Sequence, residues 1–237
     1  MNKYQWDWEF FLRDNGGGQT YLDWILSAWG WTISVAFSAL VIALVIGSVI
    51  GTIRTVPNTL LNRIGNAWVE LFRNIPLLVQ IFMWYHVLPQ IFLSLRHVPP
   101  FVLVVCGLGF FTSARIAEQV RAGIQSLPRG QRMAGLATGM TMAQTYRYVL
   151  LPMAYRIIIP PLTSESMNII KNSSVAFAVS IAELTQYAMQ VQEETSRGIE
   201  TYLAVTALYF LSAFAVNRMM SFVEIKVRVP GYIGGGK

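Results

Sequence analysis

Four long stretches of the sequence carry no Asp, Glu, Lys or Arg, and they constrain the fold more than any other feature. They are residues 24–53, 74–95, 97–114 and 201–217. A helix of roughly 20 apolar residues crosses a bilayer core of about 30 Å. Four stretches of this kind in a chain of 237 residues indicate a polytopic membrane protein and argue against a buried soluble core.

The composition supports a membrane location. Charged residues make up 13% of the chain, against about 25% in soluble domains. The net charge of +6 raises the alternative of nucleic-acid binding, but the basic residues lie mostly between the apolar stretches, so topology explains them better and no nucleic-acid partner is expected. The single cysteine, Cys106, excludes an internal disulfide and a Cys-x-x-Cys metal site. Asp7, Glu9 and Asp14 argue against a cleavable signal peptide.

We expect an all-α polytopic membrane protein with about five transmembrane helices. The candidate spans are residues 27–53, 66–89, 98–119, 155–186 and 200–222. The fourth is the weakest, because it contains Glu165 and Lys171 and because its Pro160-Pro161 pair should bend or break the helix. It still counts as a span, since broken and polar helices are tolerated where they line a cavity inside protein.

The basic residues favour one orientation in the membrane. If the N-terminus lies outside, the inner segments hold eleven Lys and Arg residues and the outer segments hold four. The positive-inside rule therefore predicts an outer N-terminus and a cytoplasmic C-terminus. We expect an extracytoplasmic segment (1–26), a transmembrane domain (27–222) with a cytoplasmic loop (121–156), and a cytoplasmic tail (223–237).

Gly47 and Gly51 form a GxxxG motif in the first span. The motif permits close approach of two helices. Because glycine is common in membrane helices, packing within the chain is a better interpretation than a dedicated dimer seam.

The loop at 121–156 is too long and too structured for a plain connector. Residues 132–138 predict a short helix, and Gly139 supplies a C-cap turn. A second short helix is expected from about 142 to 150 and should end at Pro152, which cannot continue a helical hydrogen-bond ladder. Two short helices around a turn form a knob that suits docking into a cleft on another protein.

The same loop resembles the EAA coupling loop of permeases in ATP-binding-cassette (ABC) importers. That family's pattern is G-Q-x-E-A-A-x-x-x-G, followed by x-L-P. Residues 130–139 here read G-Q-R-M-A-G-L-A-T-G, and Leu151-Pro152 follow. Met133 replaces the family's acid, which often contacts the nucleotide-binding subunit, and Gly135 replaces its second alanine.

Further stretches extend the resemblance over most of the chain. Residues 69–80, 117–124, 151–162 and 171–174 are similar to signatures of the histidine, glutamine and glutamate importer family, in the same order and spacing. Within this polar amino acid family the likeness is greatest to glutamate/aspartate permeases. The resemblance implies a type I ABC importer transmembrane fold in the bacterial inner membrane.

The resemblance also implies the partners. The chain has no GxxxxGK[S/T] phosphate-binding loop, so it is not expected to be an enzyme or to hold a cofactor. Two ATPase subunits would carry ATP and Mg²⁺, beside an extracytoplasmic solute-binding protein, membrane lipid and a second permease, either a homologue or another copy. The residues implied in ATPase coupling are Gln131, Met133, Ala134, Gly135, Gly139, Leu151 and Pro152.

Several charged residues fall at membrane depth, where each costs at least about 2.5–3.5 kcal/mol on insertion scales. Arg115 and Glu118 are three residues apart, so they either pair on one helix face or line a cavity. Glu70 and Arg73 have the same spacing, and a structural role near the inner interface is the favoured interpretation for them.

Arg115 supports a sharper hypothesis. Related permeases more often have tyrosine at this position, whereas a planar, permanently charged guanidinium can hold a carboxylate at two points. A path for an acidic amino acid must neutralise an extra carboxylate. We therefore expect Arg115 to contact the substrate.

The sequence Lys171-Asn172-Ser173-Ser174 should interrupt the fourth span, with serine and asparagine side chains satisfying the freed backbone groups. Lys171 then either lies near the translocation path or pairs with Glu165, and Asn168 could line the same cavity. Structural bracing is the alternative for this cluster. The full set of candidate substrate-binding residues is Arg115, Glu118, Glu165, Asn168, Lys171 and Ser173.

Two other functional classes stay open. An ion-coupled secondary amino-acid transporter or channel would use the membrane charges as a relay, although five spans without an internal repeat argue against many such folds. A structural membrane subunit without a pathway is the second. His86 and His97 are isolated, and the sequence shows no spacing typical of a metal site or of a nucleophile and its base.

Overall fold

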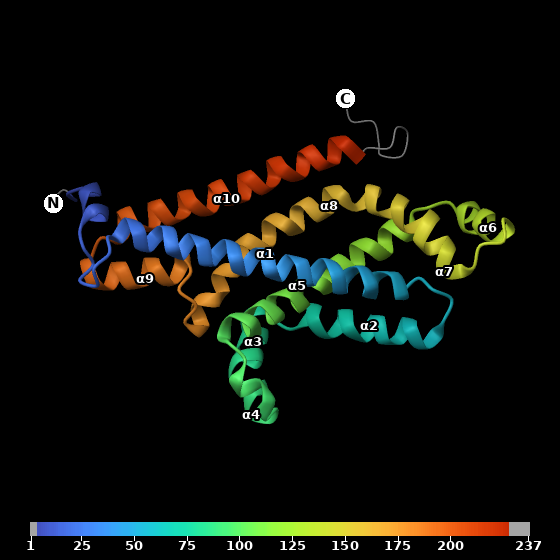
Figure 1. Ribbon diagram of the computed structural model, residues 1–237, viewed down its shortest axis with the longest axis horizontal. Helices are drawn as coiled ribbons and strands as arrows, with labels where there is room; N and C mark the ends of the chain where they lie inside the picture. The colour runs from blue at the N-terminus through green and yellow to red at the C-terminus, as the bar shows by residue number, and fades with distance from the viewer. Residues whose placement is uncertain (1–3, 228–237) are drawn as a thin grey trace. The chain divides into compact units, whose positions relative to one another are not determined.

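The computed structural model describes residues 4–227 (Figure 1). Apart from one isolated β-bridge between Asp14 and Thr20, every regular element in this range is helical, as expected for an all-α protein. The α-helices are α1 (Tyr21–Ile53), α2 (Thr59–Asn74), α3 (Leu77–Phe82), α4 (Leu88–Ile91), α5 (Pro100–Gln125), α6 (Arg129–Ala137), α7 (Met142–Thr145), α8 (Leu151–Asn172), α9 (Leu184–Thr195) and α10 (Gly198–Val227). The 3₁₀ turns are Trp8–Leu12, Leu93–His97 and Ser173–Val179, and the π-helical turns are Met83–Val87 and Tyr146–Leu150.

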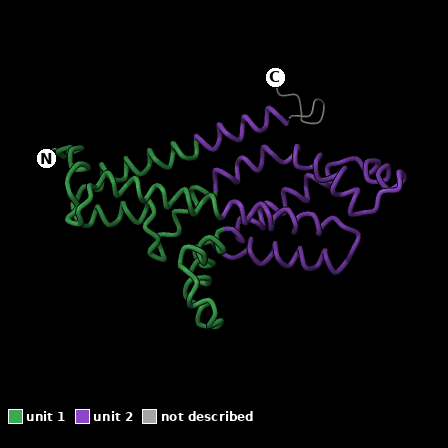
Figure 2. The backbone as a smooth tube through the Cα atoms, in the orientation of Figure 1, with its two compact units in different colours: residues 1–38, 77–108, 169–214 green, residues 39–76, 109–168, 215–237 purple. Residues whose placement is uncertain are grey.

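The chain divides into two compact units (Figure 2). Unit 1 consists of residues 1–38, 77–108 and 169–214, and unit 2 consists of residues 39–76, 109–168 and 215–237. The division falls inside α1, α5, α8 and α10, so each long helix contributes one part to each unit. Most of the predicted tail, residues 228–237, lies outside the described residues, and α10 continues to Val227.

Within residues 4–227, three helices are long and apolar enough to cross a membrane, namely α1, α5 and α10. The bent pair Thr59–Asn74 and Leu77–Ile91, with 104° between its halves, passes the same test only when taken together. The first and fifth predicted spans lie within α1 and α10, and α5 covers all but the first two residues of the third. The second predicted span, 66–89, is wrong as a single helix. The helix α2 ends at Asn74, Ile75 is extended, and α3 starts at Leu77. Pro76 explains the interruption, because proline disfavours helical geometry in the residue before it.

The fourth predicted span, 155–186, is also not one helix. The expected break at Pro160-Pro161 does not occur, because α8 runs through both prolines to Asn172. Two adjacent prolines remove only two consecutive backbone donors, and Ile158 and Leu162 are buried on either side of them. The expected interruption after Lys171 is confirmed, since a 3₁₀ turn follows at Ser173–Val179.

The predicted helix end at Pro152 is wrong as well. The π-helical turn Tyr146–Leu150 leads directly into α8, which begins at Leu151. A π turn bonds residue i to i+5, so its wider loop makes room for the proline ring that would clash with the carbonyl four residues earlier in an α-helix. The second short helix is therefore the start of a longer helical segment.

The core of unit 1 joins the N-terminal turn, the start of α1, α9 and α10. Phe10, Ile25, Leu184 and Tyr187 are buried together in it. The Tyr187 hydroxyl donates to the backbone oxygen of Tyr21 at 3.0 Å. These contacts fix α9 against the beginning of α1.

The core of unit 2 joins the later part of α1 with α5, α8 and the π turn Tyr146–Leu150. A Cβ atom at Gly47 would lie 2.8 Å from the Ile116 side chain, and one at Gly51 would lie 2.7 Å from the Ala117 carbonyl oxygen. Both glycines therefore allow α1 to approach α5 closely. The GxxxG motif packs within the chain, as its sequence interpretation favoured.

Candidate functional site

Two ion pairs connect different helices in the described part of unit 2, and the first joins α5 to α8. The Nε and Nη2 atoms of Arg115 donate to Glu165 Oε2 and Oε1 at 2.8 and 2.9 Å, respectively. The Glu165 side chain is 8% exposed, whereas that of Arg115 is 44% exposed. Glu165 thus fixes one edge of a guanidinium whose other edge stays accessible.

The second ion pair joins α2 to α5. Arg73 Nη1 lies 2.5 Å from Glu118 Oε1, with both side chains substantially exposed. The same-helix pair of Arg115 with Glu118 is therefore wrong, and Glu118 takes its cation from another helix. A pair between residues three apart on one exposed helix face is worth only a few tenths of a kcal/mol, so helical spacing alone does not hold Glu118 to Arg115.

The other candidate substrate residues on α8 and the turn after it are divided between the two units. Asn168 lies in unit 2 and is partly buried, while Lys171 and Ser173 belong to unit 1. The observed ion-pair partner of Glu165 is Arg115, and the role of Lys171 stays a prediction. Ser173 is buried and its hydroxyl donates to the Ile170 carbonyl at 2.7 Å, which satisfies a backbone group at the helix end as expected.

The segment that resembles a coupling loop has the predicted helix–Gly139–helix form. The first helix, α6, starts at Arg129, and Gly139 has a φ of +84°. The backbone N–H of Gly139 donates to the Leu136 carbonyl at 3.0 Å, and that of Met140 donates to the Gly135 carbonyl at 3.2 Å. These two bonds are the Schellman motif that ends a helix on a left-handed glycine.

Thr145 explains why glycine stands at position 135. A Cβ atom at Gly135 would lie 2.8 Å from Thr145 Cγ2 and 3.0 Å from Thr145 Oγ1. The small residue lets α6 pack directly on α7, which begins with a reciprocal capping box between Thr141 and Gln144. The departure from the family alanine is therefore matched by a neighbouring side chain.

The remaining coupling candidates are distributed over the surface of this knob. Gln131, Ala134 and Gly135 line a shallow groove of about 420 Å³ together with Met153. Met133 is 63% exposed at the other side of α6. Leu151 and Pro152 form the first turn of α8 and are partly buried and exposed, respectively.

Sequence reasoning missed a residue that fastens the knob to the turn after α1. Tyr146 is buried, and its hydroxyl donates to the Thr55 carbonyl at 2.8 Å and accepts from the Thr55 hydroxyl at 3.1 Å. The two residues are 91 positions apart. The only signal in the sequence was a tyrosine within a basic loop. It gives no indication that the hydrogen-bond partner is Thr55.

Unit 1 carries its own buried carboxylate, which was not predicted as a functional group. Glu183 caps α9 by accepting from the backbone N–H groups of Thr185 and Gln186, each at 2.9 Å. The Tyr209 hydroxyl donates to it at 2.6 Å. All of these partners are structural, so Glu183 holds α9 in place.

The N-terminal segment is held to the start of α10 by polar contacts. The Tyr4 hydroxyl and the backbone N–H of Asp7 both donate to Glu200. The hydrogen bond to Glu200, followed by burial, raises the pKa of Tyr4. Arg197 adds a hydrogen bond to the Gln5 carbonyl at 2.8 Å.

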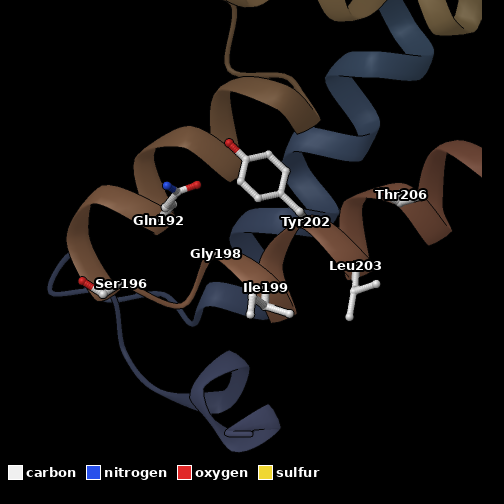
Figure 3. A pocket seen from close by; sticks show the side chains of 7 residues that line it. All are labelled: Gln192, Ser196, Gly198, Ile199, Tyr202, Leu203 and Thr206. Atoms are coloured by element: carbon white, nitrogen blue, oxygen red, sulfur yellow. The ribbon is translucent and has the colours of Figure 1, made fainter. Parts of the chain in front are cut away.

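An open groove of about 670 Å³ lies where α9 turns into α10 (Figure 3). Its lining is uncharged. In Figure 3 the Tyr202 ring extends upward on the side of Gln192, whereas Ile199 and Leu203 point downward from α10. Residues 4–227 contain no cluster of three or more His, Cys, Asp or Glu side chains that could hold a metal ion.

A family model covers most of the chain. Residues 43–229 match the binding-protein-dependent transport system inner membrane component. The glutamate/aspartate import permease protein GltJ of Escherichia coli (strain K12) is 44% identical over 241 residues, with 97% of this chain and 98% of that protein covered. The probable amino-acid ABC transporter permease protein PatM of Vibrio harveyi is 33% identical, with 86% and 91% covered.

Solved structures of ABC transporters share the fold. The crystal structure of an amino acid ABC transporter with histidines matches with a TM-score of 0.76 and 30% identity, over 87% of this chain and 95% of that chain. An inward-facing MetNI methionine ABC transporter matches with a TM-score of 0.67 at 21% identity, which supports the fold alone. The expected transmembrane fold of a type I ABC importer is confirmed. The chain therefore belongs to the family of inner membrane components of binding-protein-dependent transport systems, and it groups with the permeases of amino-acid ABC transporters.

Proposed function

We propose that this chain is the permease subunit of an ATP-driven importer that moves glutamate or aspartate across the inner membrane. The observation that carries the proposal is Arg115, a half-exposed arginine held in a fixed orientation by the enclosed carboxylate of Glu165. The similarity to the glutamate/aspartate import permease GltJ supports the same substrate class.

The chemistry of the guanidinium explains how Arg115 serves an acidic substrate. Arginine has five N–H donors in a planar fork, and the bonds to Glu165 use two of them. The outer edge keeps donors for a substrate carboxylate, while Glu165 limits the rotation of the side chain. A preoriented donor group loses less conformational entropy on binding than a free one does.

Uptake into vesicles tests this role. We expect Arg115→Tyr to abolish glutamate and aspartate uptake, and Arg115→Lys to restore it only in part because lysine lacks the planar fork. Since either change disturbs Glu165, the double variant Arg115→Gln/Glu165→Gln serves as a control that leaves no unpaired charge. Unchanged uptake of both amino acids by normally assembled Arg115→Tyr or by the double variant contradicts the proposal.

The knob at 121–156 is proposed as the cytoplasmic attachment point for two ABC ATPase subunits that bind ATP and Mg²⁺. Its support is the Gly139 Schellman turn together with the Tyr146–Thr55 hydrogen bonds, which give the knob a rigid base. A second permease completes the pathway, and a solute-binding protein delivers the amino acid from outside. The N-terminus lies outside in this arrangement.

Replacement of Gly139 by aspartate tests the attachment. No atom lies within 4 Å of a Cβ built at this position, so the change strains the left-handed turn without a steric clash. We expect Gly139→Asp to reach the membrane but to lose ATPase association and ATP-driven uptake. An ATPase-dead complex separates the rival classes: uptake that continues on an ion gradient alone identifies a secondary transporter instead.

A further inference from the structure

All charged residues between Glu118 and Glu165, called the coupling segment below, are basic. Between Glu118 and Glu165 the sequence has five arginines and no aspartate or glutamate. The two bounding carboxylates are already paired with Arg73 and Arg115. The arginines inside the segment are Arg121, Arg129, Arg132, Arg147 and Arg156.

The exposed face of α6 combines apolar and basic side chains. Met133 and Leu136 are both exposed, one turn of helix apart. Arg129 and Arg132 are exposed on the same short helix. Residues three and four apart are neighbours on a helix surface, so Met133 and Leu136 form an apolar centre with basic groups beside it.

A cavity of about 410 Å³ opens next to this face. Arg129, Arg132 and Met133 line it from α6, and Thr55 and Tyr146 line it from the rigid base of the knob. None of the described residues that line the cavity is acidic. The cavity therefore offers the guanidinium donors of Arg129 and Arg132 to an incoming group, and no carboxylate among these lining residues repels an anion.

We propose that the ATPase surface that receives this knob is acidic at its rim and apolar at its centre, with a carboxylate entering beside Arg132 and an apolar pocket receiving Met133. The inference rests on the proposed docking of the knob to an ABC ATPase. It specifies the charge of the partner's docking surface. That surface is acidic, whereas a surface that receives an acidic residue at position 133 would be basic.

Charge complementarity makes the inference directly measurable. Complementary charges at the edge of an interface mainly raise the association rate and are screened by salt. A glutamate at position 133 would bring a negative charge against the acidic rim. Installing the acid that related permeases carry there is therefore expected to weaken the complex.

The experiment uses the full-length permease purified in nanodiscs with its cognate ABC ATPase, the subunit that co-purifies with the wild-type chain. Association constants are measured by interferometry at low and high salt. We expect Met133→Glu to weaken association about tenfold at low salt and Met133→Gln to weaken it less, because glutamine removes the apolar contact without adding a charge. Arg132→Glu should weaken association at least as much as Met133→Glu.

Arg63→Glu is the matched control, since Arg63 is exposed in unit 2 but lies on α2, outside the coupling segment. We expect its association constant to stay at the wild-type value. Thermal unfolding of each permease variant alone separates a docking defect from a folding defect. The exposed position of Met133 and Arg132 predicts unchanged unfolding temperatures.

The outcomes distinguish this inference from the proposed function. Wild-type permease that binds no ABC ATPase and shows no ATP-driven uptake contradicts the docking itself. A wild-type complex that is active, but binds Met133→Glu and Arg132→Glu as tightly as wild type or more tightly, overturns only the acidic partner surface. An equal decrease of the association constant in Arg63→Glu also overturns it. Association would then depend on the net charge of the permease and not on the exposed face of α6.

Discussion

The two ion pairs of unit 2 are built from the same residue types and differ in enclosure. Arg115 and Glu165 share two hydrogen bonds, and the carboxylate is 8% exposed. The pair of Arg73 and Glu118 has a single ion-pair contact, and its side chains are 57% and 39% exposed. One pair is anchored on a buried acid, whereas the other is open on both sides.

This difference separates a pair that must stay intact from one that is dispensable. Removing one partner from an enclosed pair leaves a charge that nothing else satisfies. Removing one partner from an open pair leaves a charge that solvent or a neighbouring subunit can satisfy, and such pairs contribute little to stability. The substrate role proposed for Arg115 therefore falls on the enclosed pair, whose geometry is fixed in the absence of substrate.

The largest expected effect is that of Arg115→Gln. It leaves the Glu165 carboxylate enclosed without a cation. Breaking a fully buried pair costs about 3–5 kcal/mol, and we expect a loss below that range because the Arg115 side chain is 44% exposed. Thermal unfolding of the purified permease measures the loss. An unfolding temperature equal to that of wild type shows that Glu165 is not enclosed in the membrane.

The double variant Arg115→Gln/Glu165→Gln should recover most of that stability. Two neutral amides can hydrogen-bond to each other, and replacing a buried ion pair by uncharged groups is often neutral or stabilising. We expect a deficit of about 1 kcal/mol or less relative to wild type, with glutamate uptake still lost. Additive losses from the two single variants rule out a coupled pair.

Arg73→Gln should have a smaller effect than either variant. Exposed ion pairs are worth about 0.2–1 kcal/mol in double-mutant cycles, and the Glu118 side chain is already 39% exposed with Arg73 beside it. The unfolding temperature of Arg73→Gln is compared with that of Arg115→Gln in the same lipid. A loss for Arg73→Gln as large as that for Arg115→Gln removes the distinction between the two pairs.

The smallest effect concerns salt. Raising the ionic strength screens charges that face solvent far more than enclosed ones. The stability difference between wild type and Arg73→Gln should therefore shrink further at high salt, whereas the difference between wild type and Arg115→Gln should not change. Equal salt dependence of the two differences contradicts the assignment of one open and one enclosed pair.

Local features of the knob could be predicted from sequence because their causes lie within a few residues. Gly139 ends α6 because only a left-handed residue completes the two Schellman bonds. The interruption after Lys171 was predicted for the same kind of reason, since Ser173 and Ser174 hydroxyls bond to carbonyls three residues earlier. The helix end predicted at Pro152 was wrong, because the π turn before it changes which backbone carbonyl lies next to the proline ring.

The membrane charges show the opposite case. Helical spacing predicted Glu118 as a possible partner of Arg115. In the structure Arg115 pairs with Glu165, which is 50 residues away. Glu118 instead binds Arg73, which is 45 residues away. Helical spacing states which residues share a face and not which helix covers that face, so the true partners could not be read from the sequence.

The sequence by itself determined the membrane class, the helical fold, the knob around Gly139 and the resemblance to ABC permeases. Long charge-free stretches and a left-handed glycine act through solvation and local backbone sterics. Only the tertiary structure decided that Glu165 holds Arg115, that Tyr146 fastens the knob to Thr55, and that Thr145 requires glycine at position 135. Each of these depends on side chains from separate segments meeting at contact distance, and helix packing sets that distance.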